Sequence, residues 1–140
     1  MSKVYRIGIT KNNNQEIREV KEIILLAGKG IVGDRYFHVH NESRNQLTLI
    51  ESENIDYYNE KFNLKIPYLN FRRNIVTKDI KLNDLVGKKL IIEKTELRGI
   101  DLCRPCKPLQ KNLAQENIIK EFLRKGGLRC EILTSSSIKI

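Results

Sequence analysis

Short apolar runs that end in turn-forming clusters recur along this chain, and this pattern restricts its fold more than any other feature. A regular alternation of strands with helices, as in a doubly wound parallel sheet, is not evident. The segments with strand character cover residues 4–9, 17–27, 46–50, 74–77, 89–94, 95–102 and 128–132. The sequence therefore predicts a mainly β protein, a mostly antiparallel β-barrel with two or so peripheral helices.

Two segments have the apolar spacing of a helix. In the first, Ser52 is the predicted N-cap, and Ile55 and Tyr58 begin one apolar face. In the second, Asn112 is the predicted cap, and the glycines of residues 125–127 end the helix. We expect both helices to lie at the periphery of the barrel.

The length of 140 residues favours one domain that covers residues 1–140. Such a chain can bury a core without disulfides or metals. The N-terminus carries Lys3 and Arg6 and has no apolar stretch long enough for a signal peptide or a membrane span. Three cysteines, an odd number, do not suit a secreted disulfide framework. We therefore expect a cytoplasmic protein with free thiols and no membrane partner.

The net charge of +9 makes the surface attractive to phosphates and other polyanions. The abundance of Lys, Asn and Ile is also what a biased genome would impose, so the charge indicates a class of partner and not a function. The aromatic pairs Tyr36–Phe37 and Tyr57–Tyr58 are isolated, and no stacking platform for bases is evident. Nucleic acid is therefore the less favoured partner.

Residues 28–33 match the G-x-G-x-x-G pattern of dinucleotide-binding sites, and Glu53 follows about twenty positions later. That fingerprint works because a helix begins at the glycines and directs its N-terminus at the pyrophosphate. Residues 34–40 show no helical periodicity. The sequence therefore predicts turns with positive φ at these glycines, although their backbone could still approach an anion closely.

Residues 101–108 read Asp-Leu-Cys-Arg-Pro-Cys-Lys-Pro and form the most chemically distinctive stretch of the chain. A thiol reacts or binds metal as its thiolate, and cations such as Arg104 and Lys107 favour that form when they lie close to the sulfur. Prolines on both sides of Cys106 restrict the backbone. Cys106 is therefore the predicted reactive thiol.

Other interpretations of the cysteines remain open. A thioredoxin-like C-x-x-C needs its first cysteine at the start of a helix, whereas the predicted cap at Asn112 delays the helix here. A zinc site could combine the two loop cysteines with Cys130 and either His38 or His40, but no second paired motif is present. Cys130 on a strand face is more typical of a small buried side chain, and the loop thiols could also be unremarkable.

Four blocks occur in order along residues 30–134, and together they resemble the MOSC family, which is named for the C-terminal domain of molybdenum cofactor sulfurases. The blocks are Gly33-Asp34-Arg35, Arg44 with residues 46–50, Arg72-Arg73-Asn74 with residues 75–76, and Pro105-Cys106. Each block is weak by itself, but their order and spacing are fairly specific. The resemblance implies a mostly antiparallel β-barrel that is associated with molybdenum cofactor or with its sulfur chemistry.

The resemblance also implies roles for particular residues. Cys106 corresponds to the cysteine that either carries sulfur or ligates molybdenum in the family. The predicted cofactor-binding residues are Gly33, Asp34, Arg35, Arg44, Arg73, Asn74 and Lys107. Molybdopterin carries a phosphate and a dithiolene, so a protein that binds it needs cations for the phosphate and a soft ligand for the metal. The basic residues of this set and Cys106 are of these two kinds.

The chain departs from the family pattern at residues 134–140, which replace the usual last element of the family. The sequence therefore does not decide whether the barrel closes. It also lacks the sulfurase domain of longer relatives, so we expect a sulfurase or reductase partner. The first hypothesis is a molybdenum-cofactor-binding or sulfur-relay domain that acts through Cys106. Whether this is a component of an oxidoreductase or a sulfur transferase stays open. The alternative is a basic β-barrel that binds nucleic acid or another polyanion without catalysis.

Overall fold

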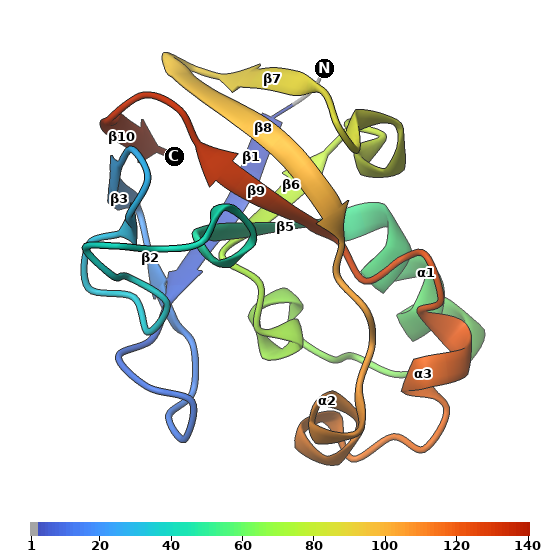
Figure 1. Ribbon diagram of the computed structural model, residues 1–140. Coiled ribbons are helices and arrows are strands. Elements are labelled where there is room, and N and C mark those ends of the chain that lie inside the picture. The colour runs from blue at the N-terminus through green and yellow to red at the C-terminus, as the bar shows by residue number, and fades with distance from the viewer. Residues whose placement is uncertain (1–2) are drawn as a thin grey trace.

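The computed structural model describes residues 3–140 and shows two sheets (Figure 1). The larger sheet has the strand order β2 (Arg18–Val20), β1 (Lys3–Ile9), β6 (Ile75–Lys78), β5 (Leu47–Glu51), β9 (Leu128–Ile132), β8 (Thr95–Leu102) and β7 (Lys89–Ile92). The smaller sheet has the order β10 (Ser136–Lys139), β3 (Glu22–Leu26) and β4 (Gly30–Ile31). Every pairing is antiparallel except that of β5 with β6. The predicted mainly β class is confirmed.

The larger sheet curls into a half-barrel, and the smaller sheet packs against it. Their shared core follows from the period of two along each strand, which places alternate apolar side chains on one face. In β9, for example, Leu128, Cys130 and Ile132 are buried as predicted. The core joins them to large-sheet residues such as Ile75 and to small-sheet residues such as Leu25.

The C-terminal residues form part of the smaller sheet. Strand β10 pairs with β3 in the register Ser136 to Leu25 and Lys139 to Glu22. Hydrogen bonds join the two sheets nearby, since Gly28 N donates to Ile132 O at 3.1 Å and Glu96 N donates to Thr134 Oγ1 at 2.9 Å. Residues 136–139, whose role in closing the barrel the sequence left undecided, therefore form a strand of the smaller sheet, which packs against the half-barrel.

The helices α1 (Ser52–Lys61), α2 (Lys107–Leu113) and α3 (Ile118–Glu121) gather at the lower right of Figure 1, away from the smaller sheet. Short 3-10 turns cover η1 (Ser43–Asn45), η2 (Tyr68–Phe71) and η3 (Leu82–Leu85). A second core forms where Ile50 and Val76, on β5 and β6, meet helix residues such as Ile55 and Phe122.

The predicted helix starts were wrong in both cases. Ser52 is wholly buried inside the first turn of α1, and Glu51 precedes the helix in its place. In the second case α2 begins directly after Cys106, and Ala114 ends it with a left-handed φ of 55°. The predicted continuous helix after Asn112 is therefore two short helices, because the chain turns between α2 and α3.

The glycine pattern makes turns, as predicted. Gly28, Gly30 and Gly33 have φ values of 74°, 128° and 87°, which favour glycine. No helix follows them, since residues 32–42 contain only turns, bends and irregular backbone. The nucleotide-binding interpretation of this motif therefore has no structural support.

Candidate functional site

A hollow of about 150 Å³ lies where β5, β9 and the loop after β8 come together. Six arginines, two cysteines and three polar or aromatic residues line it: Arg35, Arg44, Arg72, Arg73, Arg104, Arg129, Cys103, Cys106, Asn45, Thr48 and Tyr36. Four of these, Arg35, Arg44, Arg73 and Cys106, were predicted site residues. The fold thus brings a basic group and a sulfur from distant parts of the chain into one hollow.

Arg35 is the most unusual of these arginines because its side chain is only 6% exposed. Its Nη2 donates to the carbonyl oxygen of Arg72 at 3.1 Å, and its Nη1 lies 3.7 Å from Oδ1 of Asp34. Within residues 3–140, however, its Nε and Nη1 have no hydrogen-bond partner. Buried donors are nearly always satisfied in folded proteins. Arg35 therefore presents spare donors at a hollow that a small anion would fit.

Gly33 and Asp34 support Arg35 and do not line the hollow. Gly33 has the positive φ that the turn into this segment requires. Asp34 is buried and accepts hydrogen bonds from Thr10 N at 3.2 Å and from Tyr36 N at 3.5 Å. These contacts fix the backbone on both sides of Arg35, whose guanidinium stacks 4.4 Å from the centre of the Tyr36 ring.

Asn74 also lies behind the hollow, where it joins three strands. Its Oδ1 accepts hydrogen bonds from Thr48 N at 3.1 Å and from Thr48 Oγ1 at 3.2 Å, and its Nδ2 donates to Gly8 O at 3.2 Å. Thr48 itself lines the hollow. The adjacent Arg73 is held by donation from its Nε to Gly126 O at 2.8 Å. Asn74 thus positions the strands from which Thr48 and Arg73 reach the hollow.

The three cysteines are free thiols, as predicted, but they differ in access to solvent. Cys106 is exposed, whereas Cys103 and Cys130 are buried. Burial raises the pKa of the Cys103 thiol, although Arg73 and Arg129 act in the opposite direction. Burial likewise raises the pKa of Cys130, and Cys103 adds to that shift. Cys106 is therefore the thiol that an incoming molecule can reach.

Because α2 starts at Lys107, the second cysteine of the C-x-x-C sequence lies at the start of a helix and the first does not. Cys106 is the residue before α2, and Pro108 occupies the first turn, where its missing N–H costs nothing. Cys103, the first cysteine, follows β8 and is buried, so the thioredoxin-like arrangement with its first cysteine at a helix start is not present. Lys107 is exposed at the start of α2 and does not line the hollow.

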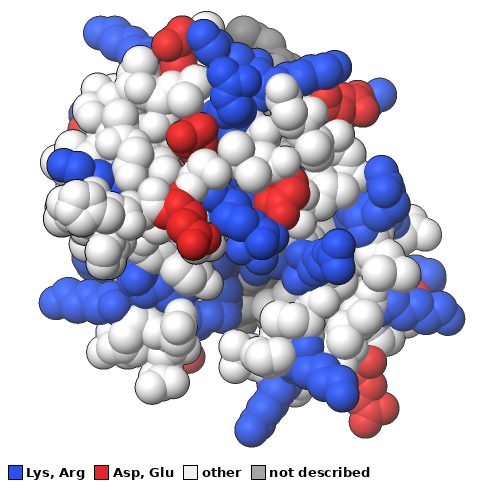
Figure 2. Space-filling view, in the orientation of Figure 1, with Lys and Arg blue, Asp and Glu red and all other residues white. Residues whose placement is uncertain are grey.

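One carboxylate bridges two arginines at the hollow. Oδ2 of Asp101 lies 2.6 Å from Nη2 of Arg44, and Oδ1 of Asp101 lies 3.9 Å from Nε of Arg129. The remaining guanidinium groups crowd one another: burial and the nearby charge of Arg35 lower the pKa of Arg72. Figure 2 shows basic side chains in a band across the middle of this face. The charges of the hollow favour an anion.

Arg72, Arg104 and Arg129 line the hollow although they were not predicted to bind a ligand. Arg104 and Arg72 were visible as neighbours of the predicted residues. Arg129 reaches the hollow through strand pairing, since it lies opposite Asp101 of β8 and opposite Thr48 of β5.

Within residues 3–140, no group of three or more His, Cys, Asp or Glu side chains is placed to hold a metal ion. The zinc interpretation therefore finds no ligand set in the described part of the chain. His38 and His40 interact locally, with His40 N donating to Nδ1 of His38 at 3.0 Å. None of the helices within residues 3–140 has the length and the hydropathy that are needed to cross a bilayer.

The family model described as the MOSC domain matches residues 34–140. The chain belongs to the MOSC domain family. This domain is known from proteins related to molybdenum cofactor sulfurases. The match begins at Asp34 and includes the arginines and cysteines of the hollow. No curated protein matches the chain.

Several solved structures have the same fold at low sequence identity. The YUAD protein from Bacillus subtilis is 16% identical with a TM-score of 0.84, and the similarity covers 99% of this chain and 92% of that one. YiiM from Geobacillus stearothermophilus is 14% identical with a TM-score of 0.79, over 99% of this chain and 71% of that one. YiiM from Escherichia coli is 16% identical with a TM-score of 0.68, over 96% and 66%. These likenesses show that nearly the whole chain has the fold of these solved structures.

Proposed function

We propose that this MOSC domain binds molybdenum cofactor in the arginine hollow and uses Cys106 as its sulfur group. The observation that supports this most directly is the buried guanidinium of Arg35, whose Nε and Nη1 have no hydrogen-bond partner within residues 3–140, in the same hollow as the exposed Cys106. The pairing of spare cationic donors with an accessible sulfur fits a ligand that has an anionic group and a soft metal centre.

The basic side of the hollow would hold the phosphate of the cofactor. The guanidinium groups of Arg35, Arg72 and Arg73 each donate a hydrogen bond to a backbone carbonyl oxygen, so they need little reorganisation when an anion binds. Arg44 and Arg129 already share Asp101, and a phosphate would compete with that carboxylate for them. Guanidinium groups suit this role because their donors match pairs of phosphate oxygens.

The sulfur side of the hollow would act through Cys106. When bound, the cofactor would supply redox chemistry at its metal or accept a sulfur atom. As a metal ligand, Cys106 would provide a thiolate. As a sulfur carrier, its thiolate would attack the terminal sulfur of a donor persulfide and release the donor as a thiol. The first role suits a component of an oxidoreductase with a reductase partner, and the second suits a sulfur transferase with a sulfurase partner.

Cofactor loading tests this proposal. We expect protein purified from a cofactor-competent host to contain molybdenum by mass spectrometry and the fluorescent oxidised pterin. Arg35→Lys keeps the charge but loses the planar fork, so both signals should fall, whereas Arg98→Ala, on β8 but outside the hollow, should leave them unchanged. Cys106→Ser should lose molybdenum or, for a carrier, the capacity to take up persulfide. Wild-type protein that lacks both metal and persulfide uptake would rule out both roles.

A second candidate function is the binding of a polyanion such as nucleic acid without catalysis. The basic band in Figure 2 and the net charge of +9 favour it. This function predicts affinity for single-stranded oligonucleotides that falls steeply as salt is added and that is the same in Cys106→Ser. Affinity that depends on Cys106, or the absence of any salt-dependent binding, would argue against it.

A further inference from the structure

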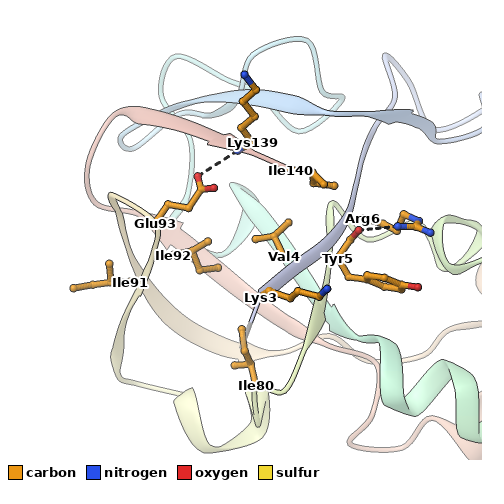
Figure 3. A pocket seen from close by; sticks show the side chains of 10 residues that line it. All are labelled: Lys3, Val4, Tyr5, Arg6, Ile80, Ile91, Ile92, Glu93, Lys139 and Ile140. Atoms are coloured by element: carbon orange, nitrogen blue, oxygen red, sulfur yellow. Dashed lines mark hydrogen bonds between the residues drawn. The ribbon is translucent and has the colours of Figure 1, made fainter. Parts of the chain in front are cut away.

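The larger sheet leaves an open seam between β1 and β7. Among the described residues β7 pairs only with β8, and β1 pairs with β2 only from Ile7 onward. A cavity of about 510 Å³ lies between these strands, within the size range of small-molecule sites. Ten residues line it: Lys3, Val4, Tyr5, Arg6, Ile80, Ile91, Ile92, Glu93, Lys139 and Ile140 (Figure 3). None of them lines the arginine hollow.

The middle of the seam is aliphatic. Figure 3 shows Val4, Ile92 and Ile140 directed toward the same space, with Ile80 beside them. Val4 and Ile80 pack against the core with one side and line the cavity with another, and Ile140 is half-exposed. Water in contact with these side chains is displaced favourably by an alkyl chain, because the burial of apolar surface lowers the free energy.

One end of the seam is cationic. Three basic groups approach the ring of Tyr5: Nζ of Lys3 lies 5.7 Å from the ring centre, the guanidinium of Arg6 lies at 4.3 Å, and Nζ of Lys78 lies at 4.3 Å. Of these cations, only Arg6 has a carboxylate within 4 Å in the described chain, at 3.6 Å from Glu19. Lys3 and Arg6 also line the cavity, so their positive charges would stabilise an anion at this end.

The opposite end of the cavity is closed by an internal contact. Lys139 N donates to Oε2 of Glu93 at 3.3 Å, and Figure 3 shows this pair on the far side of the aliphatic residues from Tyr5. In Figure 3 the carboxylate of Glu93 is separated from Arg6 by Val4. The seam thus has one anion-attracting end and an aliphatic middle.

We propose that this seam binds a free medium-chain carboxylate. Its carboxylate lies beside Lys3 and Arg6, and its alkyl chain lies over Val4, Ile80 and Ile92. The site is separate from the arginine hollow, so its occupation does not depend on cofactor binding. A second copy of the chain, docked on the open strand edges, is the competing occupant.

A nuclear magnetic resonance titration tests this proposal on the full chain. We expect octanoate to cause saturable shifts of the backbone amides of Val4, Tyr5 and Ile92. Octanol, which lacks the charge, should bind about fivefold more weakly, and octylammonium should cause no saturable shift. Equal responses to all three compounds, or shifts that occur elsewhere in the chain, would contradict the proposed site.

Matched variants separate the charge from the apolar surface. Lys3→Glu should weaken octanoate binding about fivefold, whereas Lys111→Glu on α2 makes the same charge change away from the seam and should have little effect. Ile140→Ser should weaken binding, whereas Ile24→Ser, at a similarly exposed position on β3, should not. Unchanged affinity in both seam variants would overturn the proposal. Sedimentation that shows a dimer abolished by Ile140→Ser would also overturn it, in favour of the second copy.

Discussion

At the scale of single residues, the three cysteines show how the fold gives the same side chain different chemistry. Cys130 lies on the buried face of β9, and Cys103 is buried just after the end of β8. Burial favours the neutral form of both thiols. Cys106 lies three residues after Cys103, directly before the first residue of α2, and is exposed. Only this last sulfur is open to reagents while the protein is folded.

Thiol titration with Ellman's reagent checks this difference. We expect one thiol to react rapidly in the folded protein and all three to react in denaturant, because the buried thiols cannot form thiolates that contact the reagent. In Cys106→Ser the rapid phase should disappear. The measurement is the absorbance of the released thiolate against time. Rapid reaction of a second cysteine in the folded protein would show that Cys103 is more accessible than its burial indicates.

Some residues that line the hollow stand in local patterns of the sequence, whereas Arg129 reaches it only through strand pairing. Cys106 and Arg35 stand in short distinctive stretches, and both line the hollow. Asn74 was predicted as a cofactor-binding residue, but its hydrogen bonds to Thr48 and Gly8 run between strands, and no local pattern reveals such a position behind the hollow.

At the scale of elements, the entry to β9 depends on two glycines. A Cβ atom on Gly126 would overlap the carbonyl oxygen of Cys103, and one on Gly127 would overlap the carbonyl oxygen of Leu49. Gly127 also has a φ of 110°. These residues were predicted only as the end of a helix. Their small size lets β9 insert between β5 and β8, and it also brings Arg73 to the carbonyl oxygen of Gly126.

Alanine at Gly127 tests how tightly the strands approach. Gly127→Ala should lower the free energy of unfolding by about 3 kcal/mol or more, because both the backbone angle and the overlap with Leu49 oppose it. Gly87→Ala is the matched control, since Gly87 also has a positive φ, of 77°, but has no atom within 4 Å of its added Cβ. Its cost should be about 1 kcal/mol. Urea denaturation measures both, and equal costs would contradict the steric explanation.

The strands were easier to predict than the helices for a physical reason. A period of two is visible within five residues, and β8 matches its predicted range of 95–102. Helix α2 was missed because the predicted cap lay at Asn112, whereas Pro108 stands in the first turn of α2, where proline is tolerated. The break at Ala114 depends on a left-handed backbone angle for which alanine gives no signal.

At the scale of the whole molecule, the buried neutral thiols make the free energy of unfolding fall as the pH becomes alkaline. The pKa values of Cys103 and Cys130 are raised above the ordinary thiol value of 9.0, so folding favours their protonated forms. Their contribution is present in full below pH 9 and is lost as the pH rises above it, because the unfolded chain then releases protons that the folded chain retains.

The free energy of unfolding should therefore fall above pH 9, by up to about 1.4 kcal/mol per pH unit for each buried thiol. Cys130→Ala should reduce this slope, whatever its effect on stability at neutral pH, and Cys106→Ser should not reduce it. Urea denaturation between pH 8 and pH 10.5 gives the slopes, roughly spanning the ordinary thiol range. An identical slope in Cys130→Ala would show that this thiol ionises in the folded protein.

The residues of the arginine hollow are recruited from five separate stretches of the chain, at 35–36, 44–48, 72–73, 103–106 and 129. No segment shorter than residues 35–129 contains all of them. An arrangement distributed in this way cannot be moved to another protein as one loop, because its parts meet only when the strands that carry them are paired.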